Sequence, residues 1–284
     1  MQTREIPAGE FTFTVREEGP PDGPLVLFLH GFPQSSHEWR HQLAAVGAAG
    51  YHAVAPDLRG YSPGARPTGV ERYRANELVG DVVGIADALG ADRFHLVGHD
   101  WGAALAWQVA GRQPARLASL TAVSVPHPVA MSAAMAGDEE QRAKSAYIKL
   151  FRLEGKAEDV LLADGGRRLV GMLRGYDFEP AEIEEYVGRL RDRATLTAAL
   201  NYYRAFGRAD VEAMGPVTTP TLYVWSTGDQ ALGRTAAEET GQHVSGPYRF
   251  EVLEGVSHWV PEQAAERVSE LVLAHVRAND VPVG

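Results

Sequence analysis

The chain has 284 residues, of which 45% are hydrophobic and 23% are charged, enough for one large globular domain with an insertion. Its formal net charge of −10 disfavours nucleic acid as a partner. The absence of cysteine excludes disulfides, thiolate catalysis and cysteine-ligated metals. Because neither a signal peptide nor an apolar run of ~20 residues is visible, we expect a cytoplasmic protein without a membrane span.

The first part of the chain alternates strand patterns with helix patterns. Short apolar runs of four to eight residues are typical of buried strands, and apolar residues at helical spacing predict the helices between them. The predicted strands cover residues 11–15, 25–29, 51–55, 94–97 and 117–125, and the predicted helices cover 75–89 and 101–110. This rhythm predicts an α/β fold, a mostly parallel sheet with helices on both faces.

The alternation stops at Pro126-His127-Pro128, and helical patterns alone continue to about residue 215. Strands return at 221–225 and 248–253, followed by a helix over 261–277. We therefore expect an α/β core formed by 1–126 and 216–284, interrupted by a helical cap domain over 127–215. Such a cap is expected over the carboxyl ends of the strands, where α/β proteins bind ligands.

The sequence Gly98-His99-Asp100-Trp101-Gly102 follows a predicted buried strand and has the form of a nucleophile elbow. The usual serine is replaced by Asp100. A serine in this position attacks a carbonyl, whereas a carboxylate can displace a leaving group from an sp³ carbon and form an ester. Asp100 is therefore the predicted nucleophile.

Hydrolysis of such an ester requires a base, a group that orients the base, and donors for an oxyanion. His258, between the last strand and the last helix, is the predicted base, and Asp229, after the strand at 221–225, is the predicted orienting acid. Glu254 is a weaker candidate for the acid, because it lies close to His258 along the chain. The predicted oxyanion donors are the backbone N–H groups of Phe32 and Trp101.

Four motifs, in this order, resemble the epoxide hydrolases of the α/β-hydrolase superfamily. They are His30-Gly31-Phe32-Pro33, Asp57-Leu58-Arg59-Gly60-Tyr61, the elbow around Asp100, and Ser257-His258-Trp259. The resemblance runs from about residue 25 to 261. It implies the α/β-hydrolase fold and an aspartate nucleophile, with an Asp-His-Asp triad.

The resemblance also implies two cap tyrosines that donate hydrogen bonds to the epoxide oxygen. Asn201-Tyr202-Tyr203-Arg204 matches one family pattern and indicates Tyr203, and the stretch from Ser145 to Phe151 resembles the other and indicates Tyr147. A phenol suits this role because its ordinary pKa of ~10 keeps it protonated near neutral pH. Tyr202 and Tyr176 are the alternatives.

The expected reaction is hydrolysis of a small apolar epoxide to a vicinal diol by water, through an Asp100 ester, with no metal and no cofactor. Expected substrate-binding residues are Trp101, Trp107, Leu150 and Phe151, while Phe178 and Phe206 are further possible pocket walls. The protein is expected to be a monomer or a homodimer.

Two other functions stay open. One is a haloalkane or haloacid dehalogenase with the same triad, although Phe32 offers no side-chain donor for a halide and Trp101 stands where fluoroacetate dehalogenases carry arginine. The other is a non-catalytic binding protein with the α/β-hydrolase fold, which the intact triad disfavours.

Overall fold

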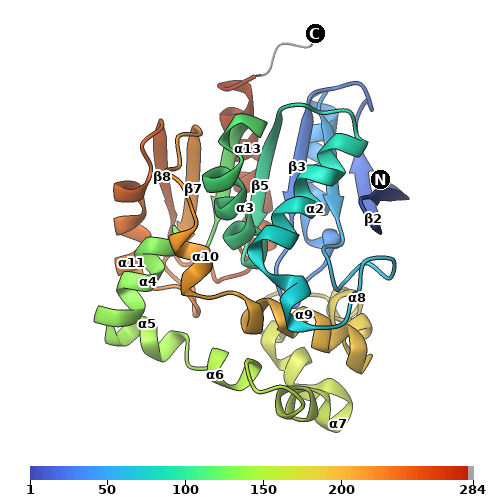
Figure 1. The fold of residues 1–284 in the computed structure, drawn as a ribbon, viewed down its shortest axis with the longest axis vertical. Helices are drawn as coiled ribbons and strands as arrows, with labels where there is room; N and C mark the ends of the chain where they lie inside the picture. The colour runs from blue at the N-terminus through green and yellow to red at the C-terminus, as the bar shows by residue number, and fades with distance from the viewer. Residues whose placement is uncertain (281–284) are drawn as a thin grey trace.

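The computed structural model describes residues 1–280, which form a mixed eight-stranded sheet between two layers of helices (Figure 1). The strand order is β1-β2-β4-β3-β5-β6-β7-β8. The first two pairings in this order are antiparallel and the others are parallel. The strands are β1 (Gln2–Ala8), β2 (Phe11–Glu18), β3 (Leu25–Leu29), β4 (His52–Pro56), β5 (Phe94–His99), β6 (Leu117–Val123), β7 (Thr221–Ser226) and β8 (Tyr248–Leu253).

Helices cover both faces of the sheet, as the alternating pattern predicts. One face carries α2 and α3, and the other carries α1 and α13, which pack against each other. Each central strand is buried from end to end, which explains its continuous apolar sequence. The core helices are α1 (Arg40–Ala48), α2 (Ala75–Ala88), α3 (Trp101–Arg112), α11 (Arg234–Glu239), α12 (Val260–Gln263) and α13 (Ala265–Arg277), with 3₁₀ turns η1 (Ser36–Trp39), η2 (Val70–Tyr73), η3 (Pro114–Arg116) and η4 (Thr240–His243).

A run of helices lies between β6 and β7 in the chain, and we call it the helical insertion. In Figure 1 it lies across one end of the sheet. The insertion consists of α4 (Pro128–Gly137), α5 (Glu139–Lys144), α6 (Ile148–Phe151), α7 (Lys156–Leu173), α8 (Pro180–Leu190), α9 (Arg193–Ala205) and α10 (Arg208–Glu212).

Helix α8 ties the insertion to the core through polar contacts. The Arg189 guanidinium lies 2.5 Å from a carboxylate oxygen of Asp57 in the core. The Tyr186 hydroxyl donates a hydrogen bond to Glu262, which is 2.5 Å away on α12. Because burial leaves polar groups dependent on such partners, these contacts fix this end of the insertion over the sheet.

Three details differ from the sequence-based prediction. Strand β1 was not expected, because only Ile6 and Ala8 of its seven residues are buried and it pairs at the edge of the sheet with β2. The predicted strand at 117–125 ends at Val123. The predicted last helix is broken at Ala264, whose φ of −118° and ψ of 37° are not helical.

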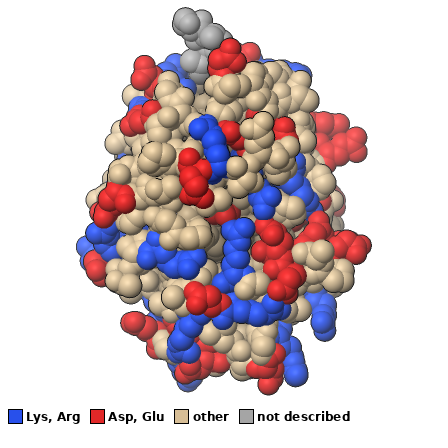
Figure 2. Space-filling model, turned by 90° about the vertical axis from the view of Figure 1, so that its right-hand side faces the viewer, with Lys and Arg blue, Asp and Glu red and all other residues tan. Residues whose placement is uncertain are grey.

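Charged residues are mixed in sign over the surface shown in Figure 2, where Lys and Arg alternate with Asp and Glu and form no extended area of one sign. Within residues 1–280, no helix is both long and apolar enough to cross a membrane.

Candidate active site

Asp100 occupies a strained turn between β5 and α3. Its φ of +50° and ψ of −121° lie outside the conformations that a non-glycine residue adopts readily. The flanking glycines permit this turn, because a Cβ atom on Gly98 would lie 2.3 Å from the Gly102 carbonyl oxygen, and one on Gly102 would lie 2.0 Å from the Leu29 oxygen. The backbone therefore presents the Asp100 side chain at the carboxyl end of β5, as a nucleophile elbow does.

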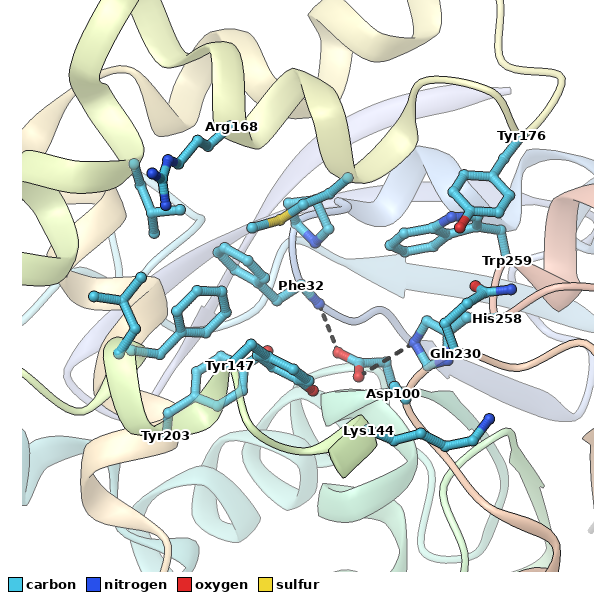
Figure 3. Close-up of a pocket in the computed structure, with 16 residues that line it drawn as sticks. Phe32, Asp100, Lys144, Tyr147, Arg168, Tyr176, Tyr203, Gln230, His258 and Trp259 are labelled. Carbon is cyan, nitrogen blue, oxygen red and sulfur yellow. Dashed lines mark hydrogen bonds and ion pairs between the residues drawn. The ribbon is translucent and has the colours of Figure 1, made fainter. Parts of the chain in front are cut away.

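The three predicted triad residues lie together at this edge of the sheet, and Figure 3 shows two of them, Asp100 and His258. The His258 Nε2 atom is 3.5 Å from Asp100 Oδ2, and its Nδ1 atom is 2.8 Å from Asp229 Oδ2. The other Asp229 oxygen accepts hydrogen bonds from the backbone N–H groups of Ala231 and Leu232, at 2.7 and 2.9 Å. Asp229 is thus held in place and positions the imidazole ring.

The charges of the triad are strongly coupled. Burial disfavours the charged form of His258, but the carboxylates of Asp229 and Asp100 outweigh it and raise the pKa of His258 to about 10. Burial also disfavours the charge on Asp100, yet its contact with His258 brings the pKa of Asp100 below its ordinary value. In the resting protein Asp100 is therefore ionised and the imidazole of His258 is protonated.

The alternative acid, Glu254, lies elsewhere. Its side chain is exposed, and it accepts a hydrogen bond from the Thr227 hydroxyl instead of from His258. The expectation that it could replace Asp229 does not fit this geometry.

The backbone N–H of Phe32 donates a 2.8 Å hydrogen bond to Asp100 Oδ1, so one of the two predicted oxyanion donors faces Asp100. Trp101 is the first residue of α3, and its N–H has no acceptor within the helix because it lies in the first turn. The two donors come from separate loops that the parallel sheet brings to the same edge.

Both predicted tyrosines belong to the helical insertion and face Asp100 across a cavity (Figure 3). Tyr203, on α9, is buried, and its ring centroid lies 4.8 Å from that of Trp101. Tyr147 directly precedes α6, with its ring centroid 6.2 Å from that of Tyr203. Although 37% of Tyr147 is exposed to solvent, its partial removal from water, followed by the negative charge of Asp100, raises the pKa of its hydroxyl, which therefore stays protonated.

The alternative tyrosines are placed differently. The Tyr202 hydroxyl points away from Asp100 and donates to the Arg59 carbonyl at 2.9 Å. Tyr176 does line the cavity, on the side of Trp259 (Figure 3).

Two cavities meet at Asp100, and Asp100, Tyr147, Tyr203 and Ala231 line both of them. The larger cavity has a volume of about 360 Å³, within the range of small-molecule sites, and the smaller has a volume of about 230 Å³. Leu150 and Phe151 line the larger cavity, and Trp101 and Phe206 line the smaller one. Phe178 lines neither and packs against Trp259 and Tyr186.

Trp107 is the one predicted substrate-binding residue that the structure places in the core. It is fully buried, its indole N–H donates to the Val125 carbonyl at 3.0 Å, and its ring packs on Tyr223. Six residues along an α-helix correspond to a rotation of about 240°, so Trp107 cannot face the same way as Trp101.

A buried hydrogen-bond chain behind the triad was not foreseen from the sequence. The Gly31 N–H lies 3.4 Å from one Glu38 oxygen, the other oxygen is 3.2 Å from His99 Nδ1, and His99 Nε2 is 2.9 Å from the His258 carbonyl. Burial raises the pKa of Glu38 and lowers that of His99 to about 4. Burial thus disfavours a charge on either group, and this chain of hydrogen bonds links the backbone of Gly31 to the backbone of His258.

Comparisons with known proteins agree with this architecture. Residues 24–265 match the family model described as the alpha/beta hydrolase fold. The chain is 33% identical to Epoxide hydrolase A of Mycobacterium tuberculosis, over 91% of this chain and 92% of that protein. It is 32% identical to AB hydrolase superfamily protein YfhM of Bacillus subtilis, over 94% of each chain.

Among solved structures, Epoxide Hydrolase A from Mycobacterium thermoresistibile superposes with a TM-score of 0.86 and 28% identity, over 99% of both chains. The fold is therefore that of the α/β hydrolases, as the sequence predicts. Within that superfamily, the chain belongs to the epoxide hydrolases.

Proposed function

We propose that the protein hydrolyses an epoxide to a vicinal diol through a covalent ester of Asp100. The observation that carries the proposal is the position of Tyr147 and Tyr203 at the cavity walls beside an ionised carboxylate. A carboxylate can attack an epoxide carbon, and a phenol can protonate the oxygen that leaves. Residues 127–215 act as a cap domain that supplies the phenols.

The first step forms the ester. Tyr147 and Tyr203 donate hydrogen bonds to the epoxide oxygen while an Asp100 oxygen attacks a ring carbon from the opposite side. The carbon–oxygen bond of the ring breaks as the new carbon–oxygen bond forms. The released alkoxide takes a proton from one tyrosine, which becomes a phenolate.

Ester formation also converts His258 into a base. The ester carries no charge, so one of the two carboxylates that raise the pKa of His258 is neutralised. The imidazolium then releases its proton, which restores the tyrosine. His258 becomes neutral only at the stage where a base is needed.

In the second step, neutral His258, oriented by Asp229, removes a proton from water. The resulting hydroxide attacks the ester carbonyl of Asp100, and the Phe32 and Trp101 N–H groups stabilise the oxyanion. The tetrahedral intermediate collapses, the bond between the Asp100 carbonyl carbon and the alcohol oxygen breaks, and the proton of the added hydroxyl passes to the departing alkoxide. The diol leaves, and the Asp100 carboxylate and protonated His258 are regenerated. All atoms of one water molecule and one epoxide appear in the product.

Halide displacement is the second candidate, because the same triad can form an ester by expelling a halide. A halide leaves without a proton but is stabilised by N–H donors, and Phe32 supplies no side-chain donor. The two phenols fit an oxygen leaving group better.

The proposal is tested with a panel of styrene-type, aliphatic and polycyclic epoxides beside haloalkanes of matching carbon skeleton. We expect diol formation from epoxides and no halide release. Asp100→Ala should bind substrate but form no diol, while Asp138→Asn, a helix N-cap on α5, should retain activity. Halide release without diol formation would favour the second candidate.

A further inference from the structure

The larger cavity has one unusual wall residue, Arg168, which comes from the second half of α7. Backbone conformation is non-helical from Ala163 to Gly166, so α7 consists of two helical segments joined by a left-handed turn. In the second segment, Arg168 and Met172 are four residues apart and therefore share one side of the helix. Both line the larger cavity.

Arg168 is not neutralised by any neighbour within residues 1–280, since it has neither an ion pair nor a hydrogen bond there. The adjacent Arg167, by contrast, lies 3.7 Å from Asp164. The other cations of the larger cavity have partners: protonated His258 contacts Asp100 and Asp229, and Lys144 donates to the Asp229 carbonyl and lies 3.6 Å from Glu140. Arginine is permanently charged and Arg168 is exposed to solvent, so Arg168 presents a free guanidinium where this cavity opens to solvent.

The charged groups of the larger cavity lie at opposite ends. Asp100 is the only carboxylate among the described residues that line the larger cavity. Figure 3 shows Arg168 on the far side of the cavity from the Asp100–His258 pair. The apolar side chains of Leu150, Phe151, Leu161 and Met172 also line this cavity.

The smaller cavity lacks this arrangement. Its cation, Arg152, donates to the Tyr203 carbonyl at 2.9 Å and is thereby engaged in holding α6 against α9. Its remaining described wall residues, apart from Asp100, carry no charge. The two sides of the nucleophile therefore offer different surroundings to the two arms of a substrate.

We infer that the preferred substrate is an epoxide with a carboxylate at the end of one aliphatic arm, and that Arg168 binds this carboxylate. The inference rests on the proposed function and specifies its substrate. The carboxylate pairs with the guanidinium, the methylene spacer packs on the apolar wall, and the epoxide reaches Asp100. The spacer keeps the substrate carboxylate away from Asp100, because two anions close together repel each other. Arg168 is a specificity-determining residue and takes no part in bond making.

The test uses terminal epoxides with a carboxylate at the other end, a graded series of spacer lengths, and the primary amide of each acid. Diol formation is measured at low and high salt for the unaltered protein, Arg168→Gln and Arg167→Gln. At the best spacer length we expect the acid to exceed its amide about tenfold in kcat/KM, through a lower KM. Arg168→Gln should abolish this preference and leave the amide rates unchanged, and Arg167→Gln should keep the preference.

Salt provides a second readout. The screening length falls from about 10 Å at 0.1 M to about 3 Å at 1 M, so the preference for the acid should shrink with salt. Arg168→Glu should make the acid worse than its amide.

Equal rates for acid and amide at every spacer length would overturn the inference and leave the proposed function intact. An equal loss for both substrates in Arg168→Gln would also overturn it, because Arg168 would then act on the fold of the cap. If neither acid nor amide gave diol, the proposed function and this inference would both fail.

Discussion

Replacing Asp229 by asparagine separates the two chemical steps of the proposed mechanism. Asp229 Oδ1 accepts hydrogen bonds from two backbone N–H groups, and Oδ2 faces His258 Nδ1 at 2.8 Å. In Asp229→Asn the amide oxygen must stay with the two backbone donors, so the amide NH₂ group faces Nδ1. Neutral His258 must then accept at Nδ1 and carry its proton on Nε2.

That tautomer cannot take a proton from water at Nε2. A wrong tautomer of this kind costs about 10⁴-fold in serine proteases, where the same aspartate-to-asparagine change was made. We therefore expect ester hydrolysis to slow by about 10³- to 10⁴-fold, equivalent to about 4–5.5 kcal/mol. Ester formation needs only Asp100 and the tyrosines, so it should slow by no more than about tenfold.

The assay is rapid mixing with excess epoxide, followed by acid quench and mass spectrometry of the peptide that contains Asp100. Asp229→Asn should accumulate close to one equivalent of ester, while the unaltered protein accumulates less. Asp138→Asn is the matched control. Loss of ester formation in Asp229→Asn, or hydrolysis at the original rate, would refute the assignment of His258 and Asp229 to the second step.

Three further changes have defined outcomes. Tyr203→Phe should slow ester formation by about 10²–10³-fold in stopped-flow measurements, whereas Tyr202→Phe should not, because its hydroxyl bonds to backbone in the core. Burial raises the pKa of Glu262 from 4.5 to about 7. Between pH 4.5 and pH 7 the folded protein therefore keeps a proton on Glu262 that the unfolded chain has released. The free energy of unfolding consequently falls as the pH rises through this range. Glu262→Gln should remove this loss, so that in urea unfolding the free energy of unfolding of the variant, relative to the unaltered protein, is about 1–3 kcal/mol more favourable at pH 8 than at pH 4.5. An unchanged pH dependence would contradict the raised pKa of Glu262. Gly102→Ala should lower the free energy of unfolding by at least about 2 kcal/mol, because its Cβ would lie 2.0 Å from a strand carbonyl oxygen, while Gly80→Ala, with open space on α2, should not.

Local sequence rules were sufficient for the order of strands and helices and for the elbow that carries the proposed nucleophile. Asp100 stands in a glycine-flanked elbow after a continuous apolar strand, and both features are fixed by nearby residues. The polar strand β1 escaped prediction, because backbone pairing with β2 holds it and only two of its side chains are buried.

Features that depend on contacts between distant segments were harder to predict. The Glu38–His99 contact joins residues 61 positions apart, and no local pattern indicates it. Aromatic character marked both Trp101 and Trp107 as pocket residues, but only the rotation of α3 against the sheet decides which one reaches the cavity. Likewise, no sequence pattern indicated that Arg168 would line the cavity after the turn within α7.

The most direct test of the mechanism is a single turnover in water enriched in oxygen-18, with protein in excess over epoxide. If Asp100 attacks the ring, the first diol carries an oxygen from the protein and contains no label, and the heavy isotope appears in the Asp100 carboxylate. Label in the first diol, with none in the peptide containing Asp100, would show direct attack by water and contradict the covalent route.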